Sequence, residues 1–292
     1  MKYRQYLAER FPLPQFILLA GLLAAGSGVC IQTRAYGEVR SFGAIGLAFL
    51  GLLFFLFRLR LFDEIKDYAH DLRFHPGRPL QRGLLTVRDI VWMIAVSLVV
   101  EICVAVYAGA APLIYFSISL AYSLLMFKEF FAGGWLRERF TLYVFSHELL
   151  VIPLFLYVSA LQGLTPGLYK ASFVWEVALF SGCQLFFLEI SRKMRSPEQE
   201  NGARDTYTSQ YGILGASLLL SLAGAAALAL GFVACGARNP LYMAALAPFA
   251  HFSYRVMGFA RHPEARTAKA VFGASVAYFV LLSGVVIWAA LT

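Results

Sequence analysis

The sequence has little charge for its length. Only 14% of the 292 residues are Asp, Glu, Lys or Arg, whereas 60% are apolar. A soluble domain carries about 25% charged residues, and most of its surface must face water. The composition therefore excludes a soluble enzyme of this size, and it also excludes disordered and collagen-like chains. It indicates an all-α, polytopic membrane protein.

Cysteines and linkers are also scarce. The four cysteines, Cys30, Cys103, Cys183 and Cys235, lie singly in or beside four different apolar segments. None of them has the spacing of a metal site, and a disulfide scaffold needs a denser, paired pattern. We interpret them as small apolar packing residues. No Pro/Ser linker and no low-complexity tract divides the chain, so we expect a single domain over residues 1–292.

Long apolar segments dominate the chain. A segment of about 20 apolar residues is long enough to cross the hydrocarbon core of a bilayer as a helix. The first segment has no small-residue cleavage site followed by a soluble domain, so we interpret it as a helix and not as a signal peptide. We predict about nine spans, at 14–33, 42–61, 88–107, 110–128, 141–161, 171–190, 212–234, 240–257 and 269–290.

The basic residues are distributed unevenly between the two sides of these spans. Lys and Arg accumulate on the cytoplasmic side of membrane proteins. If the N-terminus is cytoplasmic, 21 of the 25 basic residues lie on that side, and the other four are Arg34, Arg40, Lys170 and Arg238. We therefore predict a cytoplasmic N-terminus, an outside C-terminus, and a plasma or inner membrane location with the polar loops facing the cytoplasm. The net charge of +8 reflects this sidedness and does not predict a nucleic-acid partner.

The first polar cluster follows the second predicted span. Asp63, Asp67 and Asp71 recur at every fourth residue, and an uninterrupted helix would place them on one face, with Glu64 beside it. Like charges at this spacing repel one another. A hard divalent cation, which prefers carboxylate oxygen, is the simplest counter-charge.

Arginines follow these acids in a loop that contains Pro and Gly. Arg78 and Arg82 are suited to hold a phosphate-type anion. Carboxylates that bind metal beside arginines that bind anions predict a diphosphate site. The alternative interpretation is a solvated helix end of mixed charge.

The segment 63–83 resembles the first aspartate-rich motif of the UbiA superfamily of intramembrane prenyltransferases. That motif is commonly Asn-Asp-x-x-Asp-x-x-x-Asp, followed by Arg-Pro-Leu. Asp63 stands where the family often has Asn, Glu64 stands where it often has Asp, and Arg78–Leu80 matches the later segment. The resemblance implies nine transmembrane helices, which agrees with the count made from the apolar segments, and one UbiA-like domain with its first motif in loop 58–87.

The family's second motif resembles the segment 189–212. Gly202, Thr206 and Gly212 resemble the Gly and Thr residues that follow its Asp-x-x-x-Asp stretch. Glu189 takes the place of the first acid, but Lys193 stands where the second acid is usual, and Glu198 comes later. Lys193 either contacts the diphosphate, displaces a metal ion, or marks chemistry that has been altered or lost.

The resemblance implies a Mg²⁺-dependent transferase of alkyl groups other than methyl, which moves an isoprenyl group from a prenyl diphosphate to an acceptor inside the membrane. It does not specify the acceptor, the prenyl length or the oligomeric state. The implied roles are catalytic for Asp67, Asp71 and Glu189; metal-binding for Asp63, Glu64, Asp67, Asp71, Glu189 and Glu198; diphosphate-binding for Arg78, Arg82, Lys128, Arg192 and Lys193; and substrate-lining for Tyr122, Glu148 and Tyr254.

The substrate-lining candidates have structural alternatives. The family often carries a Tyr and a Lys that face the diphosphate near the end of the fourth helix, where Tyr122 and Lys128 lie, although Lys128 also suits an interfacial, snorkelling position. Glu148 falls inside a predicted span, where charges are costly and usually functional. It either contacts the acceptor or forms a buried link between helices. Tyr254 closes the eighth predicted span on the side of the polar loops.

Three other functions compete with prenyl transfer. A phospholipid head-group transferase also uses aspartates spaced by four, but its Asp-x-x-Asp-Gly-x-x-Ala-Arg segment is absent. A transporter would use Glu101, Glu148 and Glu176 as a cation path, but most acids gather on the predicted cytoplasmic side. The third is a UbiA-fold protein that has lost catalysis and binds a lipid, an alternative that Lys193 keeps open.

Overall fold

The structure, a computed structural model, describes residues 1–164, 166–200, 202, 204–236 and 239–292, so Arg238 lies outside it. The described chain is helical and contains no strand. Eight segments are long and apolar enough to cross a membrane, which makes the chain a multi-pass membrane protein, as predicted. They are α2 (Leu13–Tyr36), α3 (Phe42–Lys66), α5 (Val87–Ala108), α6 (Ala110–Phe127), α8 (Phe140–Glu148) with α9 (Val151–Ala160), α10 (Ser172–Arg192), α11 (Tyr207–Ala234) and α13 (Ala265–Leu291).

The segment predicted as a span at 240–257 is a composite element. It consists of the 3₁₀ turn η4 (Pro240–Ala245) and α12 (Leu246–Arg261). Pro240 and the Asn239 cap, whose side chain accepts a hydrogen bond from the Leu241 N–H, set the start of η4. α12 has 16 residues, or about 24 Å of helix, less than the hydrocarbon thickness of about 30 Å. Only η4 and α12 together are long enough to cross.

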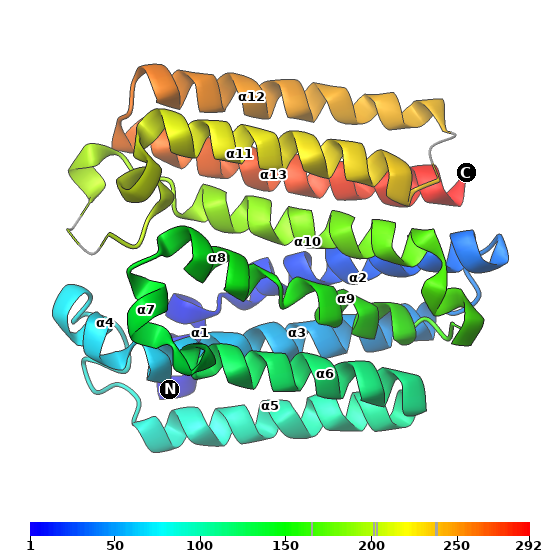
Figure 1. Cartoon of the computed structure of the whole chain (residues 1–292), viewed down its shortest axis with the longest axis horizontal. Coiled ribbons are helices and arrows are strands. Elements are labelled where there is room, and N and C mark those ends of the chain that lie inside the picture. The colour runs from blue at the N-terminus through cyan, green and yellow to red at the C-terminus, as the bar shows by residue number, and fades with distance from the viewer. Residues whose placement is uncertain (165, 201, 203, 237–238) are drawn as a thin grey trace. The chain divides into compact units, whose positions relative to one another are not determined.

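The chain divides into two compact units. The first contains Met1–Gly28 and Ser41–Thr165, and the second contains Val29–Arg40 and Pro166–Thr292. In the first unit α3 packs along α5, and α6 packs along α9 (Figure 1). In the second unit α10 packs along α11, and α12 packs along α13 (Figure 1). The first polar cluster therefore belongs to the first unit and the second cluster to the second.

A short N-terminal helix, α1 (Lys2–Arg10), is held against the first unit by charge pairs at both ends. Lys2 Nζ lies 2.7 Å from an Asp89 carboxylate oxygen, and Glu9 accepts hydrogen bonds from Arg82 at 2.7 and 2.9 Å. The Arg82 guanidinium lowers the pKa of Glu9. Between these ends Tyr6 is fully buried, and burial raises the pKa of its phenol. The helix is therefore an integral part of the first unit.

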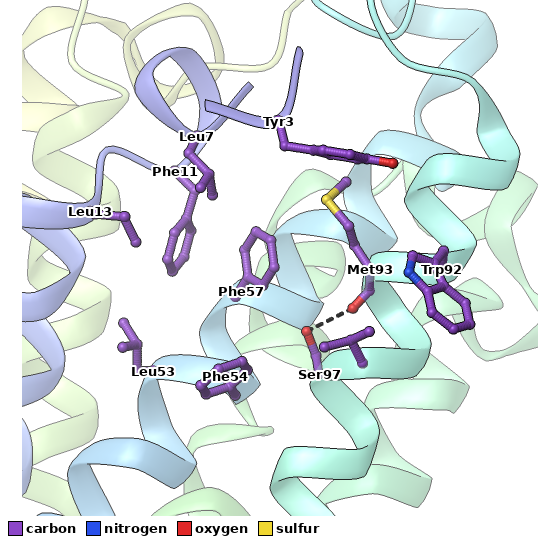
Figure 2. Close-up of a pocket in the computed structure, with 11 residues that line it drawn as sticks. Tyr3, Leu7, Phe11, Leu13, Leu53, Phe54, Phe57, Trp92, Met93 and Ser97 are labelled. Atoms are coloured by element: carbon purple, nitrogen blue, oxygen red, sulfur yellow. Dashed lines mark hydrogen bonds between the residues drawn. The ribbon is translucent and has the colours of Figure 1, made fainter. Parts of the chain in front are cut away.

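An apolar pocket of about 410 Å³ lies beside α1. Figure 2 shows Leu7 of α1 and Phe11, the residue that follows α1, facing Phe57 of α3, with Trp92 of α5 on the far wall. Most of the lining side chains are apolar. The Ser97 hydroxyl already has a partner, since it donates to the Met93 carbonyl at 2.9 Å within α5. The pocket suits a hydrocarbon chain and holds none of the predicted acidic residues.

Candidate functional site

The three predicted aspartates lie where α3 gives way to α4 (Tyr68–Phe74). Asp67 is the junction residue, with φ −93° and ψ 10°. Helical hydrogen bonds persist across it, because the Asp67 N–H donates to the Asp63 carbonyl at 2.9 Å and the Asp71 N–H to the Asp67 carbonyl at 2.8 Å. The helix is interrupted at Asp67, however, so the uninterrupted helix that the expectation of one carboxylate face assumed is not present. The Asp63 side chain is 40% exposed, while that of Asp71 is 2% exposed.

Basic side chains neutralise three of the four acids in this cluster. Lys66 Nζ is 3.6 Å from Asp63, and Arg78 pairs with the buried Asp71. Glu64 is fully buried and accepts a hydrogen bond from Arg10 Nε at 2.6 Å. Its role in the structure is thus to fasten α1 to α3.

Asp67 is different, since its carboxylate has no hydrogen bond or ion pair among the described residues. Burial raises the pKa of Asp67 to about 6. The Lys66 ammonium opposes that rise in pKa, and the negative charges of Asp63, Asp71 and Glu129 add to it. Asp67 is a carboxylate with excess negative charge around it, and an added cation would relieve the repulsion.

The donor set fits a magnesium ion that is shared with a substrate. In the described part of the chain, no three Asp, Glu, His or Cys side chains gather around one point, so an all-protein metal cage is not preformed. Mg²⁺ is usually held by one or two carboxylates and substrate phosphates. Asp67 with Asp63 or Asp71 meets that requirement.

A strained turn next to Asp67 was not predicted from the sequence. In η1 (Glu129–Phe131) three successive non-glycine residues have positive φ angles of 48°, 54° and 57°. This turn buries Glu129 and places the Phe130 ring against Tyr122 and His147, at centroid distances of 5.6 and 5.8 Å. No glycine marks η1, so the residue pattern carries no sign of it. Strain of this kind concentrates at functional sites.

Replacing Phe131 with Gly should stabilise the protein by about 0.5–1 kcal/mol. Phe131 is 81% exposed and has a φ of 57°, and a left-handed L-residue costs about 1–2 kcal/mol, part of which the flexibility of Gly in the unfolded chain cancels. Thermal unfolding in detergent would measure the change. Phe131→Ala is the matched control because it removes the ring but keeps the strain. Equal stability of the two variants would contradict the expectation.

Four other predicted residues of the first unit have clear positions. The Tyr122 hydroxyl donates to the Ser146 carbonyl at 2.7 Å and so links α6 to α8. Lys128 is exposed at the end of α6, 5.4 Å from the centre of the Phe127 ring. Glu148 is half-buried at the end of α8. Arg82 is directed to Glu9 of α1, so binding a diphosphate would require that pair to open.

In the second unit, Glu189 is already neutralised. Arg192 donates to both of its carboxylate oxygens at 2.8–3.0 Å, and Lys193 Nζ is 3.0 Å from Oε1. Lys193 therefore pairs with the acid of its own helix, one turn away. Glu198, in η3 (Pro197–Gln199), is exposed and has no side-chain partner among the described residues. Tyr254 of α12 is 65% exposed.

A buried ion pair between α3 and α5 is the largest feature that the sequence interpretation missed. Arg58 and Glu101 are fully buried, and two guanidinium nitrogens contact the carboxylate at 2.9 and 3.0 Å. Arg58 also donates to the Ser123 hydroxyl at 2.9 Å. From the sequence, Arg58 counts as the first residue of the loop 58–87, and Glu101 is considered only as part of a transporter's cation path. Opposite charges in two predicted spans were the signal that could have paired them.

Comparison with solved structures identifies the fold. The chain is similar to the apo structure of a UbiA homologue from Aeropyrum pernix K1, with 16% identity, a TM-score of 0.67, and coverage of 93% of this chain and 97% of the homologue. It is also similar to a second solved structure, described as "Structural and mechanistic insights into the biosynthesis of Digeranylgeranylglyceryl phosphate synthase in membranes". That match has 15% identity and a TM-score of 0.60, and it covers 99% of both chains. No model of a protein family and no curated protein matches the sequence.

Proposed function

We propose that this chain, which has the fold of a UbiA homologue, is a UbiA-type prenyltransferase that moves an isoprenyl group from a prenyl diphosphate to an acceptor inside the membrane. The proposal rests on the environment of the Asp67 carboxylate. This carboxylate is half-buried, lacks a partner among the described residues and lies among other acids. The basic side chains of Arg78 and Lys128 belong to the same unit. This combination supports binding of a metal diphosphate.

Magnesium is the cofactor we propose for this site. Asp67, with Asp63 or Asp71, would hold it in the first unit. Glu198 stays a metal-binding candidate of the second unit by itself. When bound, Mg²⁺ supplies positive charge to the diphosphate oxygens.

The protein's own basic side chains have a defined part in the proposed reaction. Arg78 pairs with Asp71 in the structure, and its guanidinium would exchange this carboxylate for the diphosphate of the substrate. Charge-assisted hydrogen bonds from Arg78, and charge from the exposed Lys128, would then stabilise the departing diphosphate. The bond from the allylic carbon to the diphosphate oxygen would break, the acceptor would form a bond to that carbon, and the proton lost by the acceptor would pass to the released diphosphate or to water. The uneven distribution of basic residues supports a cytoplasmic position for this diphosphate end.

Removing divalent metal should reduce prenyl transfer to background, a loss of about 100-fold or more, because the leaving diphosphate would keep its full charge. The purified chain in liposomes would be supplied with radiolabelled prenyl diphosphates and a panel of acceptors: aromatic acids, quinone precursors, tetrapyrroles, sugar phosphates and glycerol phosphate. Transfer is measured with EDTA and again after Mg²⁺ is restored. Transfer that EDTA leaves unchanged would contradict the metal dependence, and the absence of transfer to every acceptor would contradict the proposed activity.

A UbiA-fold lipid-binding protein without turnover is the second candidate. The specific observation in its favour concerns Glu189, the residue that takes the place of the first acid of the second motif. Glu189 already forms ion pairs with Arg192 and Lys193. Binding of a prenyl diphosphate without transfer would support this candidate. Gain of turnover in Lys193→Asp, which restores the usual acid, would identify Lys193 as the cause.

A further inference from the structure

A second cavity, of about 580 Å³, lies in the second unit where α10 ends and α13 begins. Ser191, Arg192 and Arg195 line it from the end of α10 and the segment that follows. Arg266 and Lys269 line it from the first two turns of α13. All of these residues belong to one compact unit, and the acids of the first polar cluster are not among them.

The charge of the lining is one-sided. Four of its side chains are cationic and none is acidic. Two of the four have acidic neighbours, since Arg192 pairs with Glu189 and Arg195 lies 3.8 Å from Asp205. Arg266 and Lys269 are exposed and have no ion pair within the part of the chain that the structure describes. The cavity therefore has uncompensated positive charge, which favours an anionic ligand.

A buried hydroxyl in the lining lacks a hydrogen-bond partner. Ser191 is 1% exposed, and its Oγ makes no hydrogen bond among the described residues. Other helical serines in this chain, such as Ser159 and Ser275, donate to the carbonyl four residues earlier. A buried hydroxyl without a partner is costly. An anion in the cavity that accepts a hydrogen bond from Ser191 would remove that cost.

The start of α13 supplies part of the wall. Ala265 and Ala268 lie in its first turn and line the cavity, whereas Glu264 caps the helix itself, so the anion-binding part of the lining consists of Ser191 and the basic side chains. The wall also has an apolar side, formed by Met194 and by Phe272, which is 41% exposed. The lining thus combines an anion-binding part with a surface for a hydrocarbon group.

We propose that this cavity is a binding site for a phosphate group, which it holds through Ser191, Arg266 and Lys269. The shared chemistry is a terminal phosphate group, whether it is the headgroup of phosphatidic acid or a soluble phosphate compound. The proposal does not depend on prenyl transfer, because it concerns binding alone.

The test uses the full chain in phosphatidylcholine nanodiscs, with and without added phosphatidic acid, and native mass spectrometry counts the bound lipid. Inorganic phosphate is titrated separately and followed by ³¹P NMR. Arg266→Gln/Lys269→Gln should weaken binding of the phosphate group about tenfold or more, since each charge-assisted hydrogen bond is strong. Arg255→Gln/Arg261→Gln is the matched control, because it removes two exposed charges of α12 that do not line the cavity.

A second variant separates binding from folding. Ser191→Ala should leave the unfolding temperature unchanged or higher, because no hydrogen bond is lost, but it should weaken phosphate binding several-fold. Binding of phosphatidic acid alone would identify a lipid headgroup site, and binding of inorganic phosphate as well would identify a general phosphate site. Either result, with the loss confined to the cavity variants, supports the proposal.

Three outcomes would overturn it. The first is equal weakening in the Arg255→Gln/Arg261→Gln control, which would indicate non-specific surface charge. The second is equal binding of phosphatidylcholine and phosphatidic acid by the wild type and the variants. The third is a rise in the KM for the prenyl diphosphate in Arg266→Gln/Lys269→Gln, which would assign the cavity to the donor site. A chain that binds phosphate but transfers no prenyl group would refute the proposed function and leave this inference standing.

Discussion

Asp67→Asn should lower the rate of prenyl transfer by about 100-fold or more. The amide keeps the shape of the side chain but removes the negative charge that we propose binds Mg²⁺. Among the described residues, Asp67 forms no ion pair, whereas Asp63 and Asp71 pair with basic side chains. Those two acids therefore cannot readily replace it. Transfer of a radiolabelled prenyl group by membranes that contain each variant would measure the effect.

The same substitution should stabilise the metal-free protein above pH 6. A carboxyl group with a pKa raised from 3.8 to about 6 binds its proton more tightly in the folded state than in the unfolded state. The folded protein therefore loses stability as pH rises from about 4 through 6, by about 1–2 kcal/mol after allowance for solvent screening. Asn does not titrate, so thermal unfolding in EDTA should show Asp67→Asn as more stable than the wild type at pH 8 and similar at low pH.

The paired measurements distinguish lost chemistry from lost folding. Glu138→Gln is the matched control, because Glu138 is 78% exposed in the same unit and lies 3.7 Å from the exposed Arg139. It should change neither transfer nor stability. Unchanged transfer in Asp67→Asn would remove Asp67 from the mechanism, and unfolding of that variant at pH 8 would show that the carboxylate is structural.

Breaking the Arg58–Glu101 pair should cost about 3–5 kcal/mol of stability. Arg58→Met leaves the fully buried Glu101 without its guanidinium partner, and Glu101→Leu leaves a buried arginine that cannot lose its charge. The double variant Arg58→Met/Glu101→Leu should be much less destabilised than the sum of the two changes, because neither charge remains. Unfolding in mixed detergent, arranged as a double-mutant cycle, measures this coupling.

Ser123→Ala is the control for this cycle. It removes the hydroxyl that accepts a hydrogen bond from the Arg58 guanidinium, and it should cost only about 0.5–1 kcal/mol, as is usual for side-chain hydrogen bonds in membrane proteins. Additive effects of Arg58→Met and Glu101→Leu would show that the two charges do not depend on each other. A cost for either single variant no greater than that of Ser123→Ala would refute the importance of the pair.

Much of the fold could be predicted from residue order. The apolar segments at 42–61 and 88–107 are helices in the structure, α3 and α5, because each must satisfy its own backbone hydrogen bonds in hydrocarbon. The segment at 240–257 was harder, since Pro240 and the Asn239 cap create a 3₁₀ start that hydropathy does not detect. The left-handed turn of η1 was also beyond prediction, because its residues have no preference for positive φ.

The candidate site divides in the same way. The sequence by itself determined which side chains are present, the fourfold spacing of the aspartates, and the gathering of charge between apolar segments, because charged residues are costly to place in hydrocarbon. Only the tertiary structure decided which charges pair. The ion pairs are Arg10–Glu64, Lys193–Glu189 and Arg58–Glu101. Asp67 has no such partner among the described residues. Such pairings depend on side-chain direction and, for Glu64 and Glu101, on contact between helices far apart in the chain, which residue spacing does not encode.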